Sequence, residues 1–264
     1  MTEQVRDPWK IVEMSRDPRR LTARDYIENV FSSFIELHGD RFFGDDPAML
    51  CGPAWLEDRP VMLLTQNRGR TEEEARICRH GMPEPEGYRK AMRLMKQAEK
   101  FRIPVVCLID TPGAFSGIEA EHRGQGSAIA NSLREMISLA TPIISVVIGQ
   151  GGSGGALALA VANHVYILRN ATYSILSPEG FANILYKDAT RKEEAARQMH
   201  ITAEDLLRLG IVEGMIDEDD DGNWNDPERS YSSMRKILTE DLDRLCAKAP
   251  EELIRDRMKR FRTY

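Results

Sequence analysis

The residues best suited to chemistry lie in the segment GQGGSGG, from Gly149 to Gly155, between two apolar runs. Glycines leave the backbone uncovered, so such a segment can surround a phosphate with N–H groups. It can also raise the Ser153 hydroxyl as a nucleophile, or direct backbone N–H groups at an oxygen that gains negative charge. The rest of the sequence has to decide between these three kinds of chemistry.

A phosphate-binding loop has the least support. The motif G-x-x-x-x-G-K-[ST] needs a lysine after its last glycine, whereas Gly155 is followed by alanine and leucine. Gly149, Gly151 and Gly154 match the dinucleotide-binding pattern G-x-G-x-x-G, but the acidic residue expected about 20 positions later is missing. The DTPG segment that begins at Asp110 resembles a GTPase switch motif, an interpretation that fails without a phosphate-binding loop.

A serine nucleophile is the alternative that stays open. Gly151, Ser153 and Gly155 match G-x-S-x-G between a predicted strand and a predicted helix, the context of a nucleophile elbow. A hydrolase of this type needs an acid and then a histidine further along the chain. Asp188 and His200 occur in that order, but both lie in segments that we predict to be surface helices.

Backbone N–H groups offer the third kind of site. Two glycine-containing turns, Thr111–Ala114 and Gly151–Gly155, each follow a predicted apolar strand. The first N–H groups of a helix have no acceptor within the helix, and the helix dipole favours negative charge there. Donors preorganised in this way stabilise oxyanions, each often by about 3 kcal/mol. The paired turns therefore indicate an oxyanion site.

Apolar strands alternate with amphipathic helices over most of the chain, which indicates an α/β fold. The predicted strands are a hairpin over 48–66 and single strands at 104–110, 142–149, 164–169, 172–176 and 211–216. The predicted helices cover 22–38, 87–101, 124–140, a segment from 156 onward, 177–187, 190–199 and 201–210. We predict a long polar loop at 67–87 and a solvated acidic linker at 217–227. A C-terminal helix follows, with Tyr231, Met234, Leu238, Leu242 and Leu245 on one face.

Composition narrows the class of protein. The chain has 264 residues and a formal net charge of −6, which argues against nucleic acid as the main partner. Its four cysteines form no C-x-x-C pair, so we expect no metal site on this chain, and Cys107 is predicted to be a buried thiol. The N-terminus lacks the apolar core of a signal peptide, and no apolar run reaches the roughly 18 residues of a membrane helix. We therefore expect a cytoplasmic protein.

Several longer motifs are specific enough to identify a family. FFGDDPAMLCG, IDTPGAFSGIEAEHRGQGSAIANSLREM, VIGQGGSGGALALAVA and TYSILSPEGFANILYKD together resemble the carboxyltransferase alpha subunit of bacterial acetyl-CoA carboxylase. The resemblance extends from about Trp9 to Ile216. It implies a fold of the crotonase/ClpP-like kind, a spiral of ββα units with peripheral helices. We expect this domain to occupy residues 1–216, with the linker at 217–227 and a helical extension at 228–264.

The resemblance also implies a reaction and partners. The carboxyl group of carboxybiotin, attached to the biotin carboxyl carrier protein, is transferred to acetyl-CoA and gives malonyl-CoA for fatty-acid synthesis. The alpha subunit acts with a beta subunit in an α2β2 heterotetramer, and biotin carboxylase completes the enzyme. The beta subunit is expected to carry a zinc ribbon and much of the acetyl-CoA site. Another acyl-CoA stays open as the acceptor.

Matching the family's motifs assigns roles to the glycines. Gly154 and Gly155 correspond to the pair whose backbone amides face the ureido oxygen of biotin. Gly151 and Gly152 would shape the turn and contribute to the cofactor site. This fits the chemistry, because the ureido nitrogen of biotin can accept the methyl proton of acetyl-CoA once CO2 is released. The protein then needs oriented donors rather than a strong base.

Two further groups complete the predicted site. Pro112, Gly113 and Ala114 correspond to a wall of the same cleft. Arg68 and Arg70 lie where the family has a basic loop, and they could contact the phosphates of CoA or the carrier protein through bidentate hydrogen bonds. Charges of a solvated loop are an equally good interpretation of both arginines.

Overall fold

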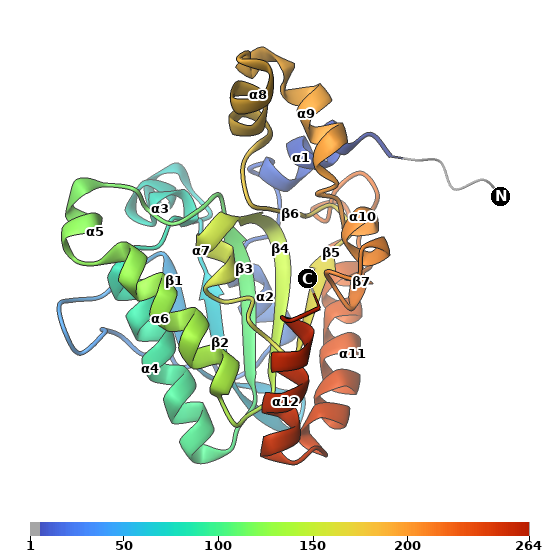
Figure 1. The fold of residues 1–264 in the computed structure, drawn as a ribbon. Coiled ribbons are helices and arrows are strands. Elements are labelled where there is room, and N and C mark those ends of the chain that lie inside the picture. The colour runs from blue at the N-terminus through green and yellow to red at the C-terminus, as the bar shows by residue number, and fades with distance from the viewer. Residues whose placement is uncertain (1–5, 264) are drawn as a thin grey trace.

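Short apolar runs of the sequence form one mixed sheet in the computed structural model, which describes residues 6–263 (Figure 1). The strand order is β1-β2-β3-β4-β5-β7, and β6 pairs with the end of β4. The hairpin partners β1 and β2 are antiparallel, and the other pairs are parallel. The strands are β1 Met49–Leu56, β2 Arg59–Gln66, β3 Val105–Thr111, β4 Ile143–Gly152, β5 His164–Leu168, β6 Thr172–Ser174 and β7 Gly214–Ile216.

Helices lie on both faces of the sheet and beyond one end of it. They are α1 Pro8–Arg16, α2 Ala23–Val30, α3 Glu72–Ile77, α4 Pro85–Phe101, α5 Ile118–His122, α6 Gln125–Ser138, α7 Ser153–Leu157, α8 Pro178–Tyr186, α9 Lys192–Met199, α10 Ala203–Arg208, α11 Pro227–Cys246 and α12 Pro250–Arg260, with 3-10 turns at Arg79–Gly81 and Ala189–Arg191. Helix α4 packs on α6, α6 on α12, and α11 on α2 and β7. Helices α1, α8 and α9 gather at the end of the sheet where β6 lies (Figure 1).

The centre of the sheet is the most deeply buried part of the fold. Every residue of β3 is buried, as are the first seven residues of β4. Continuous apolar strands of this kind need cover on both faces, which explains why the two strands show no alternation of polar and apolar residues. Cys107 is fully buried in β3, as predicted, and burial raises the pKa of its thiol.

The predicted helix over 22–38 is wrong in its second half. Helix α2 ends at Val30, and the following residues run extended beside β1. Ser32 and Trp55 exchange two backbone hydrogen bonds, and Ile35 N–H donates to the Pro53 carbonyl. The segment approaches so closely that a β-carbon at Gly52 would lie closer than 3.0 Å to backbone atoms of Ile35. The backbone N–H and C=O groups at the edge of β1 need hydrogen-bond partners, and this need outweighed the helical spacing of the apolar residues.

The predicted loop over 67–87 is also partly wrong, because it contains α3 and a 3-10 turn, and α4 already begins at Pro85. Thr71 caps α3 by accepting the N–H of Glu74, and three glutamates fill its first turn. Acidic residues there stabilise the helix through its dipole. The loop interpretation took the polarity and the Gly/Pro content as its evidence and missed this cap.

The glycine segment departs from the predicted boundaries too. Strand β4 continues to Gly152, and α7 begins at Ser153 and ends at Leu157 rather than starting at Ala156. The apolar residues after Leu157 form buried turns, in which Leu159 N–H donates to the Ala156 carbonyl. An apolar run buried on all sides has no periodicity that could distinguish a helix from turns.

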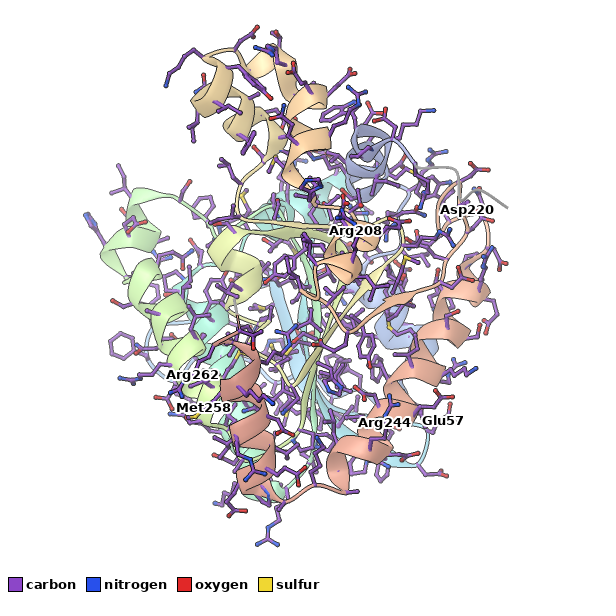
Figure 2. The ribbon with its side chains drawn as sticks, turned by 45° about the vertical axis from the view of Figure 1, so that its right-hand side comes forward. Glu57, Arg208, Asp220, Arg244, Met258 and Arg262 are labelled. Carbon is purple, nitrogen blue, oxygen red and sulfur yellow. The ribbon has the colours of Figure 1, made fainter. Side chains whose placement is uncertain are left out.

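The C-terminal part confirms the predicted apolar face, since Tyr231, Met234, Leu238, Leu242 and Leu245 of α11 are all buried. A second helix, α12, begins at Pro250, and the sequence pattern did not separate it from α11. The acidic segment before α11 is less solvated than predicted. Its Glu218 is fully buried and lies 3.1 Å from the equally buried guanidinium of Arg20, whereas Asp220 lies at the surface (Figure 2). The division into a domain, a linker and an extension stays a prediction.

We expect Glu218→Gln to lower the free energy of unfolding by about 3–5 kcal/mol, because it leaves the buried charge of Arg20 without compensation. Urea unfolding of purified protein measures the change. Asp220→Asn is the matched control: its side chain is 65% exposed and pairs with Arg169, so its loss should change the free energy by about 1 kcal/mol at most. An equal effect of both variants would contradict this role for the buried pair.

Candidate active site

The two turns singled out in the sequence lie at the same edge of the sheet. Strands β3 and β4 are parallel neighbours, and Thr111 at the end of β3 stands opposite Gly151 near the end of β4. The segments that follow β3 and β4 therefore leave the sheet side by side. In open parallel sheets this edge, beyond the carboxyl ends of the strands, is where ligands usually bind.

The turns are in direct contact, and glycine is what allows it. A β-carbon at Gly152 would lie closer than 3.0 Å to the carbonyl of Pro112 and the N–H nitrogen of Gly113. A β-carbon at Gly155 would lie equally close to the backbone nitrogen of Ala114 and to Gly113. The structure thus places the predicted wall, Pro112–Ala114, against the predicted oxyanion turn.

Helix α7 begins inside this contact. Ser153, Gly154 and Gly155 are its first residues, so their N–H groups have no acceptor within the helix. Gly154 is partly exposed, and a β-carbon there would meet Ile129 at an ordinary 3.6 Å, whereas Gly155 is buried. The geometry is that of a short row of backbone donors at the end of a glycine-rich strand.

Two buried side chains, to which the sequence interpretation gave no role in the site, hold the start of α7. Gln66 Nε2 donates to the Gly155 carbonyl over 2.7 Å, and the Tyr88 hydroxyl donates to the same oxygen over 3.4 Å. Both side chains are buried, and burial raises the pKa of Tyr88, so its hydroxyl keeps the proton that it donates. Tyr88 lies in the segment GMPEPEGYRKAMRLMKQAEKF, which also resembles the family, and it was predicted to face inward, as it does. For Gln66, a polar residue at the end of an apolar strand was the available signal.

A pocket opens beside the glycine turn, toward α1 and α8. Its lining consists of Val12, Arg16, Pro112, Gln150, Gly151, Gly152, Ser153, Thr172, Ser174, Leu176, Ser177, Pro178 and Ile201. At its edge Arg16 donates two hydrogen bonds, of 2.8 and 3.2 Å, to the carboxylate of Glu179. Gly151, Gly152 and Pro112 of the predicted site are therefore brought to one cavity, together with hydroxyl groups from β6 and from the start of α8.

The predicted basic residues lie elsewhere. Arg68 is largely buried behind the turn, where it donates to the carbonyls of Asp17 and Arg20 over 3.0 and 2.9 Å. Arg70 pairs with Asp25 and Glu28 of α2 over 2.9 and 2.6 Å. Neither side chain lines the pocket. Their contact with CoA or with a carrier protein stays a prediction.

Ser153 has some features of a nucleophile but no assembled triad. Its φ of +50° is unusual for a residue with a side chain, and it is exposed. However, the Asp188 carboxylate accepts a hydrogen bond from the Thr190 N–H, and His200 Nδ1 lies 3.5 Å from the Asp205 carboxylate. No hydrogen bond among residues 6–263 joins the Ser153 hydroxyl to a histidine or an acid.

Residues 6–263 contain neither a metal-binding cluster nor a membrane-spanning helix. Between residues 6 and 263, no three or more histidine, cysteine, aspartate or glutamate side chains converge as ligands for a metal ion. Within the same range, none of the helices combines the length and the apolar character that crossing a membrane requires.

Comparison with known proteins identifies the family. Residues 3–264 match the model of the family described as acetyl co-enzyme A carboxylase carboxyltransferase-like. The chain belongs to this family. The acetyl-coenzyme A carboxylase carboxyl transferase subunit alpha of Clostridium botulinum (strain Eklund 17B / Type B) is 52% identical and covers 98% of this chain and 94% of its own length. The protein of that name from Geobacillus kaustophilus (strain HTA426) is 48% identical over 97% of this chain and 78% of its own.

Solved structures agree on the fold. Transcarboxylase 12S, with methylmalonyl-coenzyme A and methylmalonic acid bound, matches with a TM-score of 0.73 at 20% identity. The match covers 91% of this chain but 44% of that one, so this chain spans less than half of it. A Pseudomonas malonate decarboxylase hetero-tetramer in complex with coenzyme A matches with a TM-score of 0.67 at 16% identity, over 89% and 91% of the two chains. These likenesses confirm the predicted crotonase-like architecture.

We expect Gly152→Ala to destabilise the protein by about 1–3 kcal/mol, because the new methyl group would overlap the Pro112 carbonyl and the strands would have to separate. Thermal unfolding measures the change. The control is Gly126→Ala in α6, where no atom lies within 4 Å of the added carbon; there alanine should be neutral or stabilise by about 1 kcal/mol. A neutral Gly152→Ala would show that the turns are not held in contact.

The pair at the pocket edge predicts a pH dependence. The hydrogen bonds from Arg16 hold the pKa of Glu179 below its ordinary 4.5, so the carboxylate form is favoured in the folded state. Stability from this pair is then present above pH 4.5 and is lost as the pH falls through the lowered pKa. Urea unfolding of Glu179→Gln and wild type should differ slightly at pH 7, because the pair is about one-third exposed, and should converge at low pH. A difference that persists unchanged in acid would contradict the assignment.

Proposed function

We propose that this chain is the alpha subunit of the carboxyltransferase of acetyl-CoA carboxylase, and that it transfers the carboxyl group of carboxybiotin to acetyl-CoA to give malonyl-CoA. The observation that carries the proposal is the contact between two strand-to-helix turns where no β-carbon fits at Gly152 or Gly155. A site so closely lined with backbone suits a reaction whose main requirement is to stabilise developing oxyanions. The family and its curated relatives agree with this reaction.

Each part of the site has a role in this proposal. Carboxybiotin would supply an activated carboxyl group, and its ureido nitrogen could take the proton of the acceptor's methyl group once the bond to the carboxyl group has broken and CO2 is released. The N–H groups of Gly154 and Gly155 would bind the ureido oxygen, and the hydrogen bond from Gln66 to the Gly155 carbonyl holds the start of α7 in place. Gly151 and Gly152 provide the turn, and Pro112–Ala114 limits the cleft on its other side. No acid or base of this chain has to move a proton.

Partners follow from the same proposal. The relatives are named as subunits, and the malonate decarboxylase structure is titled a hetero-tetramer. Large apolar side chains stay exposed after β6 and along α8, the helix whose start lines the pocket: Ile175 is 83% exposed, and Ile184 and Leu185 of α8 are 63% and 54% exposed. We propose that the beta subunit, with its zinc ribbon and much of the acyl-CoA site, associates in an α2β2 complex in the cytoplasm. The carrier protein and biotin carboxylase complete the enzyme.

Two alternatives would lead to different experiments. A related acyl-CoA could replace acetyl-CoA, since much of the acyl pocket is assigned to the partner. A serine hydrolase would use Ser153, which is exposed and has a positive φ. The first alternative retains the dependence on biotin, and the second replaces it by dependence on a hydroxyl group.

The test is the reverse reaction of the captured complex. Tagged chain is purified with its partner, malonyl-CoA and free biocytin are added, and acetyl-CoA formation is measured. We expect acetyl-CoA only when biocytin is present. Gly154→Val should reduce the rate about 100-fold or more, because its side chain covers the N–H groups that bind the oxyanion. The control Ser153→Ala should keep full activity, and a fluorophosphonate probe should not label Ser153 in the wild-type protein. Biocytin-independent turnover lost in Ser153→Ala, with labelling of Ser153, would establish the hydrolase instead.

A further inference from the structure

Strands β3 and β4 do not pair evenly along their length. Ile109 stands opposite Val147, but Thr111, two positions further, stands opposite Gly151, four positions further along β4. Asp110 therefore faces three residues of β4. Such an irregularity removes backbone groups from the regular ladder and changes the direction in which the strand continues. It lies immediately before the glycine turn of the proposed site.

The carboxylate of Asp110 fills this irregularity. Its Oδ1 accepts the N–H of Gln150 over 2.9 Å, in place of a backbone acceptor from the neighbouring strand. The side chain is 1% exposed. A β-carbon at Gly149 would lie closer than 3.0 Å to the same carboxylate, so a glycine is needed opposite it. Asp110 thus fixes the backbone of the last residues before the turn.

A buried arginine holds another residue of the irregular segment. Arg20 Nε donates to the carbonyl of Ile148 over 2.7 Å, and Arg20 Nη2 donates to Glu218 over 3.1 Å. Both charged side chains are fully buried. The irregular segment is therefore held by charged groups at its carbonyl side as well as at its N–H side.

Arg68 links these contacts into one network. Its Nε lies 3.3 Å from Asp110 Oδ2, and its Nη2 donates to the carbonyls of Arg20 and Asp17. The side chain is 12% exposed. One guanidinium group thus connects the loop between α1 and α2 to the carboxylate that holds β4.

We propose that Asp110, held by Arg68, is a positioning residue for carboxyl transfer: it sets the direction in which Gly151–Gly155 leaves β4 and thereby aims the backbone donors of the turn. This rests on the proposed function. Neither side chain lines the pocket, so both act through the backbone. Buried ion pairs contribute little net stability compared with apolar residues, which makes a purely stabilising role a poor explanation for this network.

The test uses the complex with its partner and compares Asp110→Asn with wild type. The asparagine keeps the size of the side chain but removes the charge and turns an N–H donor toward Arg68. In the reverse assay we expect kcat to fall about 100-fold, a loss that a displacement of about 1 Å can cause, with the KM for malonyl-CoA unchanged. Hydrogen exchange of the segment 147–157 should become faster. Asp110→Asn combined with Arg68→Gln should recover part of kcat, since the glutamine can accept from the asparagine.

Two controls separate positioning from general stability. Asp241 of α11 is also fully buried, and its carboxylate lies 2.6 Å from His164 Nδ1. Its helix neighbour Arg244 lies at the far end of the molecule from α8 and α9 (Figure 2). Asp241→Asn should lower the melting temperature without changing kcat. If Asp110→Asn does not fold, Gly149→Ala replaces it, because its methyl group displaces the same carboxylate, with Gly126→Ala as its control.

The outcomes distinguish this inference from the proposed function. If the wild-type complex forms no acetyl-CoA with biocytin, the proposed function fails, and the exchange of segment 147–157 still tests the positioning. An exchange pattern unchanged in Asp110→Asn would overturn the inference. So would a kcat of Asp110→Asn within twofold of wild type, or an equal loss of kcat in Asp241→Asn at the same loss of melting temperature.

Discussion

Everything around the proposed site depends on how closely the backbone of β4 approaches the turn after β3. At Gly152 and Gly155 the opposing chain occupies the space that a β-carbon would need. Backbone atoms at such distances form a wall of N–H and carbonyl groups rather than of side chains. This close approach requires that both strands end at the same level and that β4 changes direction just before its end, as the irregular pairing near Asp110 makes it do.

The groups that enforce this geometry are charged and buried, which is an expensive way to build a core. Arg20, Arg68, Asp110 and Glu218 lie behind the turn, and together they bind the backbone at Ile148 and Gln150. An apolar core could fill the same space, but it could not accept an N–H group or donate to a carbonyl. The network therefore orients the backbone through directional hydrogen bonds, whereas hydrophobic packing would only fill the space behind the turn.

The edges of the sheet are covered, whereas α8 carries exposed apolar side chains. Extended residues after α2 cover the edge of β1, and α11 packs on β7 at the opposite edge. Helix α8 begins at the pocket and exposes Ile184 and Leu185 further along. Contiguous apolar patches on a protein surface commonly mark interfaces. The fold thus agrees with a site that two subunits complete together.

The sequence by itself determined the α/β class, the paired turns and the family, because these depend on short motifs and on strands that are apolar throughout. The family resemblance implied that Pro112–Ala114 and Gly151–Gly155 belong to one cleft, and in the structure the two turns lie in contact where β3 and β4 end. The tertiary structure decided where the polar side chains point. The sequence left Arg68 open between a contact with phosphates or the carrier protein and a solvated charge, whereas in the structure it lies largely buried behind the turn beside Asp110. Residues 31–37 had helical spacing, yet they run along β1. The periodicity of a sequence shows which residues are apolar. It cannot show hydrogen-bond partners that are distant in sequence, because only folding brings them together.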